Sequence, residues 1–199
     1  MNLGGGTRRL PIKRRNDKIR FMKTLEIRRH SMRDKPGAHL SQAGVELARR
    51  VGAEMGPFQC VVTSKLPRAY ETAIAMGFAV NDQKKMMNTY GEDVEAEAPW
   101  PQSFAGYAAA AKKHGAARKF SRKLAKYYAD LMESLPEDGA ALAVNHGGVL
   151  ELGVIGCLPD LDYSDWGGPL GFCEGVRLTW HHGNFVEAQL LRVEDKHKN

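Results

Sequence analysis

Residues 60–73 read CVVTSKLPRAYETA and join a short apolar run to a polar turn and the start of a helix. Residues 60–63 have the length and composition of a buried strand. Pro67 fits the first turn of the helix that follows, where a proline sacrifices no helical hydrogen bond. Arg68 therefore falls just beyond the carboxyl end of a buried strand.

Two other stretches repeat this arrangement. A predicted strand over residues 25–29 leads into His30, and one over residues 140–144 leads into His146 and a pair of glycines. In open α/β sheets the carboxyl ends of parallel strands line one crevice, so residues that are distant in sequence meet there. The side chains expected to converge are Arg29, His30, Arg68 and His146.

The segments around these stretches alternate between strand and helix. Apolar residues at helical spacing predict a helix that starts after Ser41 and stops at Gly56-Pro57, and a long helix between Phe120 and Leu135. Residues 176–180 and 185–191 flank a polar turn and predict a hairpin. This order predicts a three-layer α/β/α sandwich whose sheet is mostly parallel with an antiparallel edge. Residues 81–103 show no clear period and are expected to form an insertion over the sheet.

Composition limits the class of protein. A chain of 199 residues with 43% hydrophobic content suits one domain. No apolar run approaches the ~20 residues of a membrane span, and no secretory signal is evident, so we expect a cytoplasmic protein without a membrane partner. The three cysteines lack metal-site or paired spacing, which argues against a disulfide framework and a zinc site.

The net charge of +6 is confined to the N-terminal tail. Residues 1–21 hold seven Lys or Arg and one Asp, whereas residues 22–199 hold 22 basic and 22 acidic side chains. We expect residues 1–21 to be a disordered basic extension and residues 22–199 to form the functional domain. Nucleic acid is not the expected partner, although a tail that tethers the domain to nucleic acid or membrane stays an alternative.

The converging residue types suit phosphoryl chemistry. A phosphomonoester is a dianion near neutral pH, and guanidinium groups bind its oxygens bidentately while staying charged. A neutral imidazole is a competent nucleophile toward phosphorus, and fixed positive charge stabilises the transition state. Such a site needs no metal and no cofactor.

The same residues resemble the histidine phosphatase superfamily with the phosphoglycerate mutase-like fold, in its small phosphatase branch, over residues 24–191. The matching motifs are Arg29-His30-Ser31, then Ser64, Arg68, Ala69, Thr72 and Ala73 at the family's spacing, then His146-Gly147-Gly148. The resemblance implies that His30 is the nucleophile and forms a phosphohistidine. It implies that Arg29, Arg68 and His146 bind the phosphoryl group, and the backbone at Gly147 can approach it closely.

The chain departs from the family at the general acid. Members that hydrolyse small phosphoesters place a Glu about four residues before a Gly, where it protonates the leaving oxygen. Alignment on Gly91 puts Met87 in that place, so Glu92 and Glu95 become the candidates for the acid.

These observations predict a phosphatase for a phosphomonoester or a phosphohistidine, acting on a phosphorylated small molecule or a phosphoprotein. One alternative is a relative that binds phospholigands with little or no turnover, which the missing acid motivates. Another is a phosphotransferase of the phosphoglycerate mutase type. The oligomeric state is left open.

Overall fold

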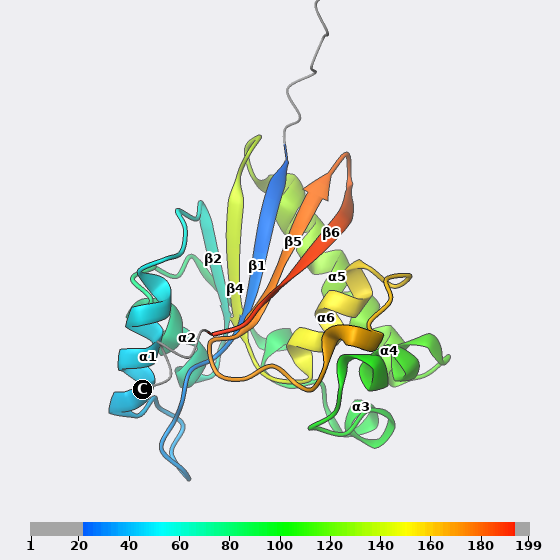
Figure 1. Ribbon diagram of the computed structural model, residues 1–199, viewed down its shortest axis with the longest axis horizontal. Coiled ribbons are helices and arrows are strands. Elements are labelled where there is room, and N and C mark those ends of the chain that lie inside the picture. The colour runs from blue at the N-terminus through cyan, green and yellow to red at the C-terminus, as the bar shows by residue number, and fades with distance from the viewer. Residues whose placement is uncertain (1–21, 194–199) are drawn as a thin grey trace, which may run out of the picture.

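The computed structural model describes residues 22–193, which form a six-stranded mixed sheet flanked by helices (Figure 1). The strand order is β3-β2-β4-β1-β5-β6, with β3, β2, β4 and β1 parallel and β5 and β6 antiparallel. The strands are β1 (Lys23–Arg29), β2 (Cys60–Ser64), β3 (Asp82–Lys84), β4 (Ala140–Asn145), β5 (Gly175–His181) and β6 (Asn184–Leu191). The predicted α/β architecture with a parallel centre and an antiparallel edge is confirmed.

Helices cover both faces of the sheet. Helices α1 and α2 lie against one face, and α5 and α6 pack together against the other, with α4 beside them (Figure 1). None of the helices within residues 22–193 is long and apolar enough to cross a bilayer. The helices are α1 (Gln42–Gly52), α2 (Pro67–Ala75), α3 (Glu92–Glu97), α4 (Phe104–Lys112), α5 (Ala116–Ser134) and α6 (Val149–Cys157).

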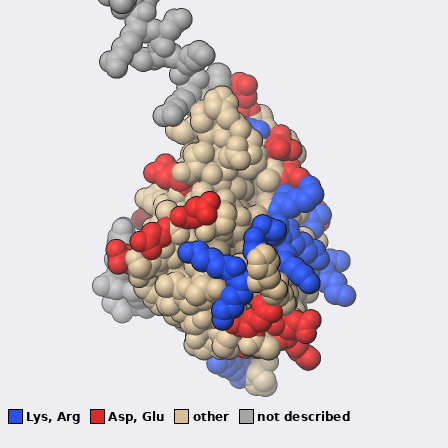
Figure 2. Space-filling model, turned by 90° about the vertical axis from the view of Figure 1, so that its right-hand side faces the viewer, with Lys and Arg blue, Asp and Glu red and all other residues tan. Residues whose placement is uncertain are grey.

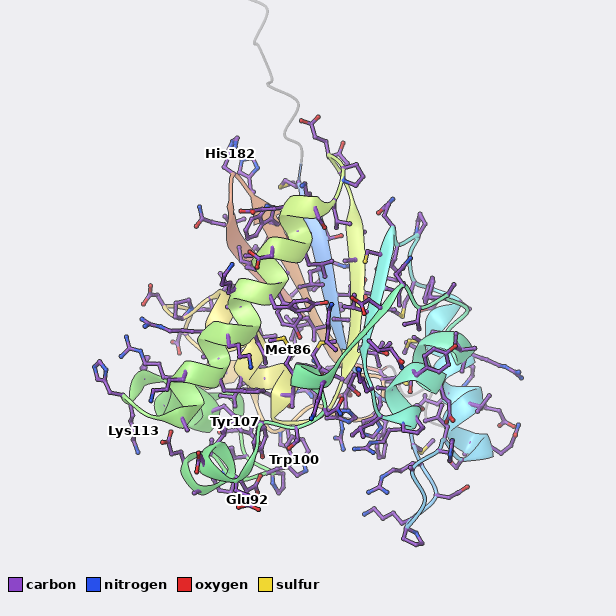
Figure 3. All side chains as sticks on the ribbon, turned by 180° about the vertical axis from the view of Figure 1, so that it is seen from behind. Met86, Glu92, Trp100, Tyr107, Lys113 and His182 are labelled. Atoms are coloured by element: carbon purple, nitrogen blue, oxygen red, sulfur yellow. The ribbon has the colours of Figure 1, made fainter. Side chains whose placement is uncertain are left out.

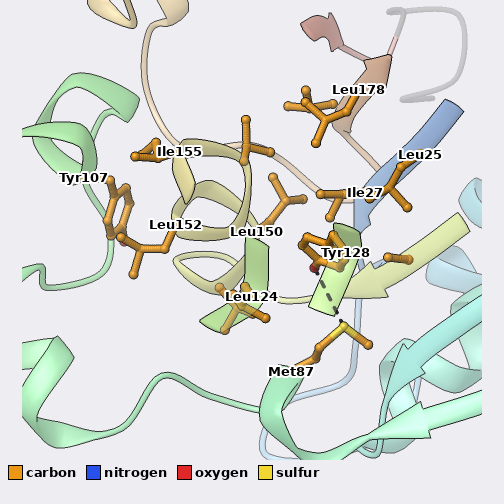
Figure 4. Packing of buried hydrophobic residues seen from close by; sticks show 14 of the residues in the cluster. Leu25, Ile27, Met87, Tyr107, Leu124, Tyr128, Leu150, Leu152, Ile155 and Leu178 are labelled. Atoms are coloured by element: carbon orange, nitrogen blue, oxygen red, sulfur yellow. Dashed lines mark hydrogen bonds between the residues drawn. The ribbon is translucent and has the colours of Figure 1, made fainter. Parts of the chain in front are cut away.

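The strands β2 and β4 supply hydrophobic side chains on both faces of the sheet, whereas β1 adds Leu25 and Ile27 to the core on the α5/α6 side only. In β4, Ala141 and Ala143 face the α5/α6 layer, whereas Leu142 and Val144 face the α2 layer, because successive side chains of a strand point to opposite sides. Figure 4 shows Tyr128 of α5 within the larger cluster, with its hydroxyl directed at the sulfur of Met87. Burial on both faces explains why β2 and β4 read as continuous apolar runs.

Residues 81–103 differ in part from the expected insertion. Asp82–Lys84 forms the parallel edge strand β3, which pairs with β2. A three-residue edge strand with polar side chains is held by backbone hydrogen bonds, so it leaves no apolar period in the sequence. The rest of this segment includes the short helix α3, in which only Val94 is buried.

The predicted end of the first helix is wrong, and the expectation for the N-terminal segment is not tested. Helix α1 ends at Gly52, before the predicted stop at Gly56-Pro57. The expectation for residues 1–21 falls outside the described residues.

Helices α1 and α4 begin in the same way, with a serine N-cap and a glycine three residues later. Ser41 Oγ accepts from Gly44 N, and Ser103 Oγ accepts from Gly106 N, both at 3.1 Å. The surroundings of the two glycines differ. A Cβ on Gly44 would lie 2.1 Å from Met32 O, a backbone atom, whereas a Cβ on Gly106 would meet only the side-chain amide of Gln102.

This matched pair predicts opposite effects on stability. Gly106→Ala should be neutral or raise the free energy of unfolding by up to about 1 kcal/mol, because Ala is the better helix former and Gln102 can turn away. Gly44→Ala should lower it by about 1–3 kcal/mol, because the Met32 backbone has to shift. Denaturant unfolding of both variants tests this. Stabilisation by Gly44→Ala would show that α1 does not approach residue 32 as described.

Candidate active site

His30 follows β1 directly, and its ring is fixed by hydrogen bonds at both nitrogens. Its backbone N–H donates to Asn145 O, which ties it to the end of the neighbouring strand β4. Its Nδ1 lies 2.7 Å from Ser31 O, and because a carbonyl only accepts, Nδ1 carries the proton. The Nε2 atom therefore bears a lone pair, toward which Arg68 Nε donates at 3.2 Å.

Helix α2 supplies Arg68 and also anchors the chain after His30. Thr72 Oγ1 accepts from Ser31 N at 2.9 Å and donates to Arg68 O at 2.6 Å. On the other side, Ser31 Oγ donates to Gly44 O in α1 at 2.7 Å. The threonine four residues after Arg68 thus anchors the backbone of Ser31, the residue whose carbonyl sets the tautomer of His30.

His146 lies beside His30, at a ring-centroid distance of 5.0 Å. Its Nε2 is 2.7 Å from Ser64 Oγ, which also accepts from Leu66 N. The hydroxyl keeps its own proton, which it can donate to His146 Nε2. In that tautomer the His146 proton is on Nδ1, where it can be donated to an acceptor.

Arg29 is held between aromatic rings. Its guanidinium carbon lies 4.9 Å from the ring centroid of Trp100 and 4.7 Å from that of Phe172, and Nη1 donates to Leu170 O at 2.6 Å. Burial lowers the pKa of Arg29, while the carboxylates of Glu151 and Glu174 act in the opposite direction. These contacts fix the direction of a half-buried guanidinium without neutralising it by an ion pair.

Two buried polar atoms of this group lack partners. Arg29 Nε and His146 Nδ1 are buried and form no hydrogen bond within the described part of the chain. Burying a donor without an acceptor costs free energy, so such atoms call for an explanation. Burial lowers the pKa of Arg68, and the like charges of the neighbouring Arg33 and Arg29 lower it further. The cluster is suited to an anion.

The glycine pair after β4 lies under two aromatic side chains. A Cβ on Gly147 would be 2.3 Å from the Trp100 ring, and one on Gly148 would be 2.1 Å from the Tyr90 ring. Gly148 also has a φ of 79°, which favours glycine. Its N–H is taken by Glu151 at 2.7 Å, so this amide is committed to the protein itself.

Sequence reasoning missed Glu151, a fully buried carboxylate in the first turn of α6. Its two oxygens accept from Gly148 N and Leu170 N, and so join the turn after His146 to the loop that binds Arg29. Burial raises its pKa. The bond from Gly148 N is one half of a capping box, and because glycine has no side chain to supply the other half, the sequence lacks the usual signature of that motif. Tyr90, Trp100 and Phe172 were also missed, and their irregular segments gave no signal.

The carboxylates predicted as acids occupy different places. Glu92 is exposed, at the outer tip of α3 (Figure 3). Glu95 is exposed too, but it accepts from Tyr90 Oη at 2.5 Å and from Trp100 N at 3.2 Å, and so holds both residues that cover the glycine pair. Met87, which the alignment on Gly91 predicts at the place of the general acid, is fully buried in the core. Within residues 22–193, no carboxylate hydrogen-bonds to His30 or Arg68.

The described residues contain no group of three or more His, Cys, Asp and Glu that could hold a metal ion. The imidazoles and guanidiniums at the site are arranged for an anionic ligand instead.

Comparison with known proteins shows the family of this chain. The family model of the histidine phosphatase superfamily (branch 1) matches residues 23–191, and the chain belongs to this superfamily. Among curated protein sequences, none matches this chain.

Solved structures share the fold at low sequence identity. A phosphoserine phosphatase from Entamoeba histolytica, in complex with 3-phosphoglyceric acid, is 18% identical with a TM-score of 0.63, covering 89% of this chain and 100% of that one. A mycobacterial glucosyl-3-phosphoglycerate phosphatase is 21% identical with a TM-score of 0.57, covering 86% and 98%. The mycobacterial hydrolase 1 is 21% identical with a TM-score of 0.62, covering 85% and 96%. Together with the superfamily, the phosphatases among them support a phosphatase type of activity.

The site predicts an unusual titration of His30. Burial, together with the charges of Arg68, Arg29 and Arg33, lowers the pKa of His30 to about 3, although its hydrogen bond to Ser31 acts in the opposite direction. Burial, then His30 and the same three arginines, lower the pKa of His146 to about 2. Both pKa values lie below the value of about 6.5 that a histidine has in the unfolded chain. The two neutral rings therefore make their full contribution to the free energy of unfolding above about pH 6.5. This contribution is lost progressively as the pH falls toward 3.

We therefore expect the His30 ring to be neutral at pH 5, with the proton on Nδ1. Nitrogen NMR of the histidine side chains checks this directly. The unfolding free energy should also fall between pH 6.5 and pH 4, and less so in a variant with Asn at positions 30 and 146. A midpoint near 6.5 for His30 would contradict the buried, cation-flanked site.

Proposed function

We propose that the protein is a phosphatase that transfers a phosphoryl group from its substrate to Nε2 of His30 and then to water. One observation carries this proposal: the Nδ1–H of His30 is bonded to Ser31 O, and the lone pair of Nε2 is directed at the guanidinium of Arg68. A neutral nucleophile beside fixed cations is the arrangement that phosphoryl transfer requires.

The reaction would proceed in two displacements. The Nε2 lone pair attacks phosphorus and forms a P–N bond, while the bond from phosphorus to the leaving group breaks and the leaving group takes a proton from solvent water. Water then attacks the phosphohistidine, gives up a proton, and returns Nε2 with its lone pair and free phosphate. Arg29, Arg68 and the Nδ1–H of His146 would bind the phosphoryl oxygens in both steps, with the backbone near Gly147 alongside.

The surroundings favour a substrate whose leaving group departs without strong acid assistance. Alignment on Gly91 puts Met87 at the family's acid position, and the candidate acid Glu95 is engaged by Tyr90 and Trp100. Tyr90, Trp100 and Phe172 are partly exposed around the site and could stack on a planar leaving group. A phosphohistidine side chain, or a phosphomonoester with a comparably good leaving group, meets both conditions.

A second candidate is a phospholigand-binding protein with little turnover. The observation that favours it is the burial of Met87 where a proton donor is expected. For either function, we propose that residues 22–199 form the functional domain in the cytoplasm and that residues 1–21 are an extension of it.

Replacing the nucleophile tests the function directly. His30→Asn should abolish both steady hydrolysis of an aryl phosphate and acid-labile labelling by a phosphodonor. His182→Asn is the matched control, because His182 lies in the turn between β5 and β6 (Figure 3). Labelling that survives in His30→Asn would refute the proposed nucleophile. Labelling of the unaltered protein without turnover would favour the binding protein.

The leaving-group dependence tests the proton donor. We expect the unaltered enzyme to hydrolyse aryl phosphates at least about 100-fold faster than alkyl phosphates, the lower range of what a general acid contributes. Glu95→Gln should slow both by the same factor, because it loosens Tyr90 and Trp100, and Glu92→Gln should change neither. A loss confined to alkyl phosphates in either variant would instead identify that Glu as the general acid.

A further inference from the structure

A second concentration of positive charge lies on α5 and the turn before it. Residues 112–126 hold seven Lys or Arg and no Asp or Glu, whereas the whole of residues 22–193 is balanced at 20 of each. Outside this stretch the described chain therefore has an acidic excess. Figure 2 shows Lys and Arg side chains gathered on the side of the molecule that α4, α5 and α6 form.

Helical geometry sorts these cations into two rows. Leu124 and Tyr128 face the core, and side chains three or four positions apart stand next to one another on the surface. Arg118 and Arg122 form one row, directed toward α4 and α6. Lys119 and Lys123 form the other row, directed toward α3.

The arginine row borders a cavity of about 230 Å³, which we name the α5 cavity. Lys112 at the end of α4 joins Arg118 and Arg122 in lining it. Small residues leave room beneath these long side chains, and Gly156 lets α6 approach α5, since a Cβ there would lie 2.2 Å from Ser121 O. The residues that line the α5 cavity are Ala108, Ala111, Lys112, Arg118, Ser121, Arg122, Ile155, Gly156, Pro159 and Asp160.

The positive charge at the α5 cavity is only partly compensated. Asp160 is the single acidic residue in the lining, and the pKa of the neighbouring Asp162 is lowered by hydrogen bonds from Ser164 and further by the charge of Lys112. Arg118 Nη1 contacts the His114 ring at 3.2 Å, and no carboxylate of the described chain forms an ion pair with Lys112, Arg118 or Arg122. By contrast, Lys126 on the same helix pairs with Asp130. Like charges around one cavity repel each other, and an anion between them would relieve this repulsion.

We propose that the α5 cavity is a second anion-binding site, distinct from the site at His30, for a small phosphate-bearing ligand with at least two negative charges. Two guanidiniums and one ammonium match the oxygens of such groups, because guanidinium binds phosphate bidentately. The α5 cavity exceeds the ~30 Å³ of a water molecule several-fold and can hold two linked phosphate groups. The inference does not depend on the proposed phosphatase activity.

Pyrophosphate is the probe, and amide NMR of the full chain locates where it binds. The titration is carried out in the unaltered protein and in His30→Asn. Amides of residues 115–122 and of Gly156 should shift in both proteins at the same concentration of pyrophosphate. Shifts confined to residues around His30 and His146 would overturn the proposal.

A pair of double variants on α5 separates a built site from general attraction. Arg118→Gln/Arg122→Gln should weaken binding at the α5 cavity by roughly tenfold or more, the factor expected for losing charged hydrogen bonds. Lys119→Gln/Lys123→Gln removes the same charge from the same helix and should leave the affinity within about threefold. Equal weakening in the two variants would overturn the proposal. Far-ultraviolet circular dichroism and the thermal unfolding midpoint should be unchanged in both variants, which verifies the fold without reference to any enzymatic activity.

Discussion

The hydrogen bond between His30 Nδ1 and Ser31 O is the contact on which the candidate site depends. It holds the lone pair of the imidazole on Nε2, and several elements serve to keep that carbonyl in place. Thr72 in α2 binds Ser31 N, and Gly44 in α1 accepts from the Ser31 hydroxyl. The packing of α1 and α2 on one face of the sheet therefore sets the chemistry at the end of β1.

A second constraint is the burial of positive charge without neutralisation. An ion pair on Arg29 would hold it in place but weaken its attraction for an anion. The chain instead places Trp100 and Phe172 against the guanidinium and uses one backbone carbonyl, Leu170 O, as acceptor. The buried carboxylate of Glu151 accepts from Leu170 N, and so holds the loop whose carbonyl binds Arg29. The guanidinium of Arg29 keeps an unpaired donor for a ligand.

The parts of the site that follow from strand ends could be predicted from the sequence. Arg29, His30, Arg68 and His146 follow buried runs, and the fold brings such positions together at one edge of a parallel sheet. Their exact pairing follows from tertiary contacts, such as Ser64 with His146, that no spacing reveals. The edge strand β3 could not be predicted, because its three polar residues are held by backbone pairing alone.

The three aromatic residues at the site could not be predicted for a related reason. Tyr90, Trp100 and Phe172 lie outside the regular helices and strands, so neither a helical nor a strand period marks them. Glu95 could be singled out as an acid near the site, but its bonds to Tyr90 and Trp100 are visible only in three dimensions.

The identity of the nitrogen that carries the phosphoryl group tests the account most directly. Protein labelled with nitrogen-15 in its histidines would be treated with a phosphodonor and quenched in base, and the site of phosphorylation read by nitrogen–phosphorus coupling. We predict a phosphoryl group on Nε2 of His30, because Nδ1 is bonded to Ser31 O. A phosphoryl group on Nδ1 of His30, or on His146, would contradict it.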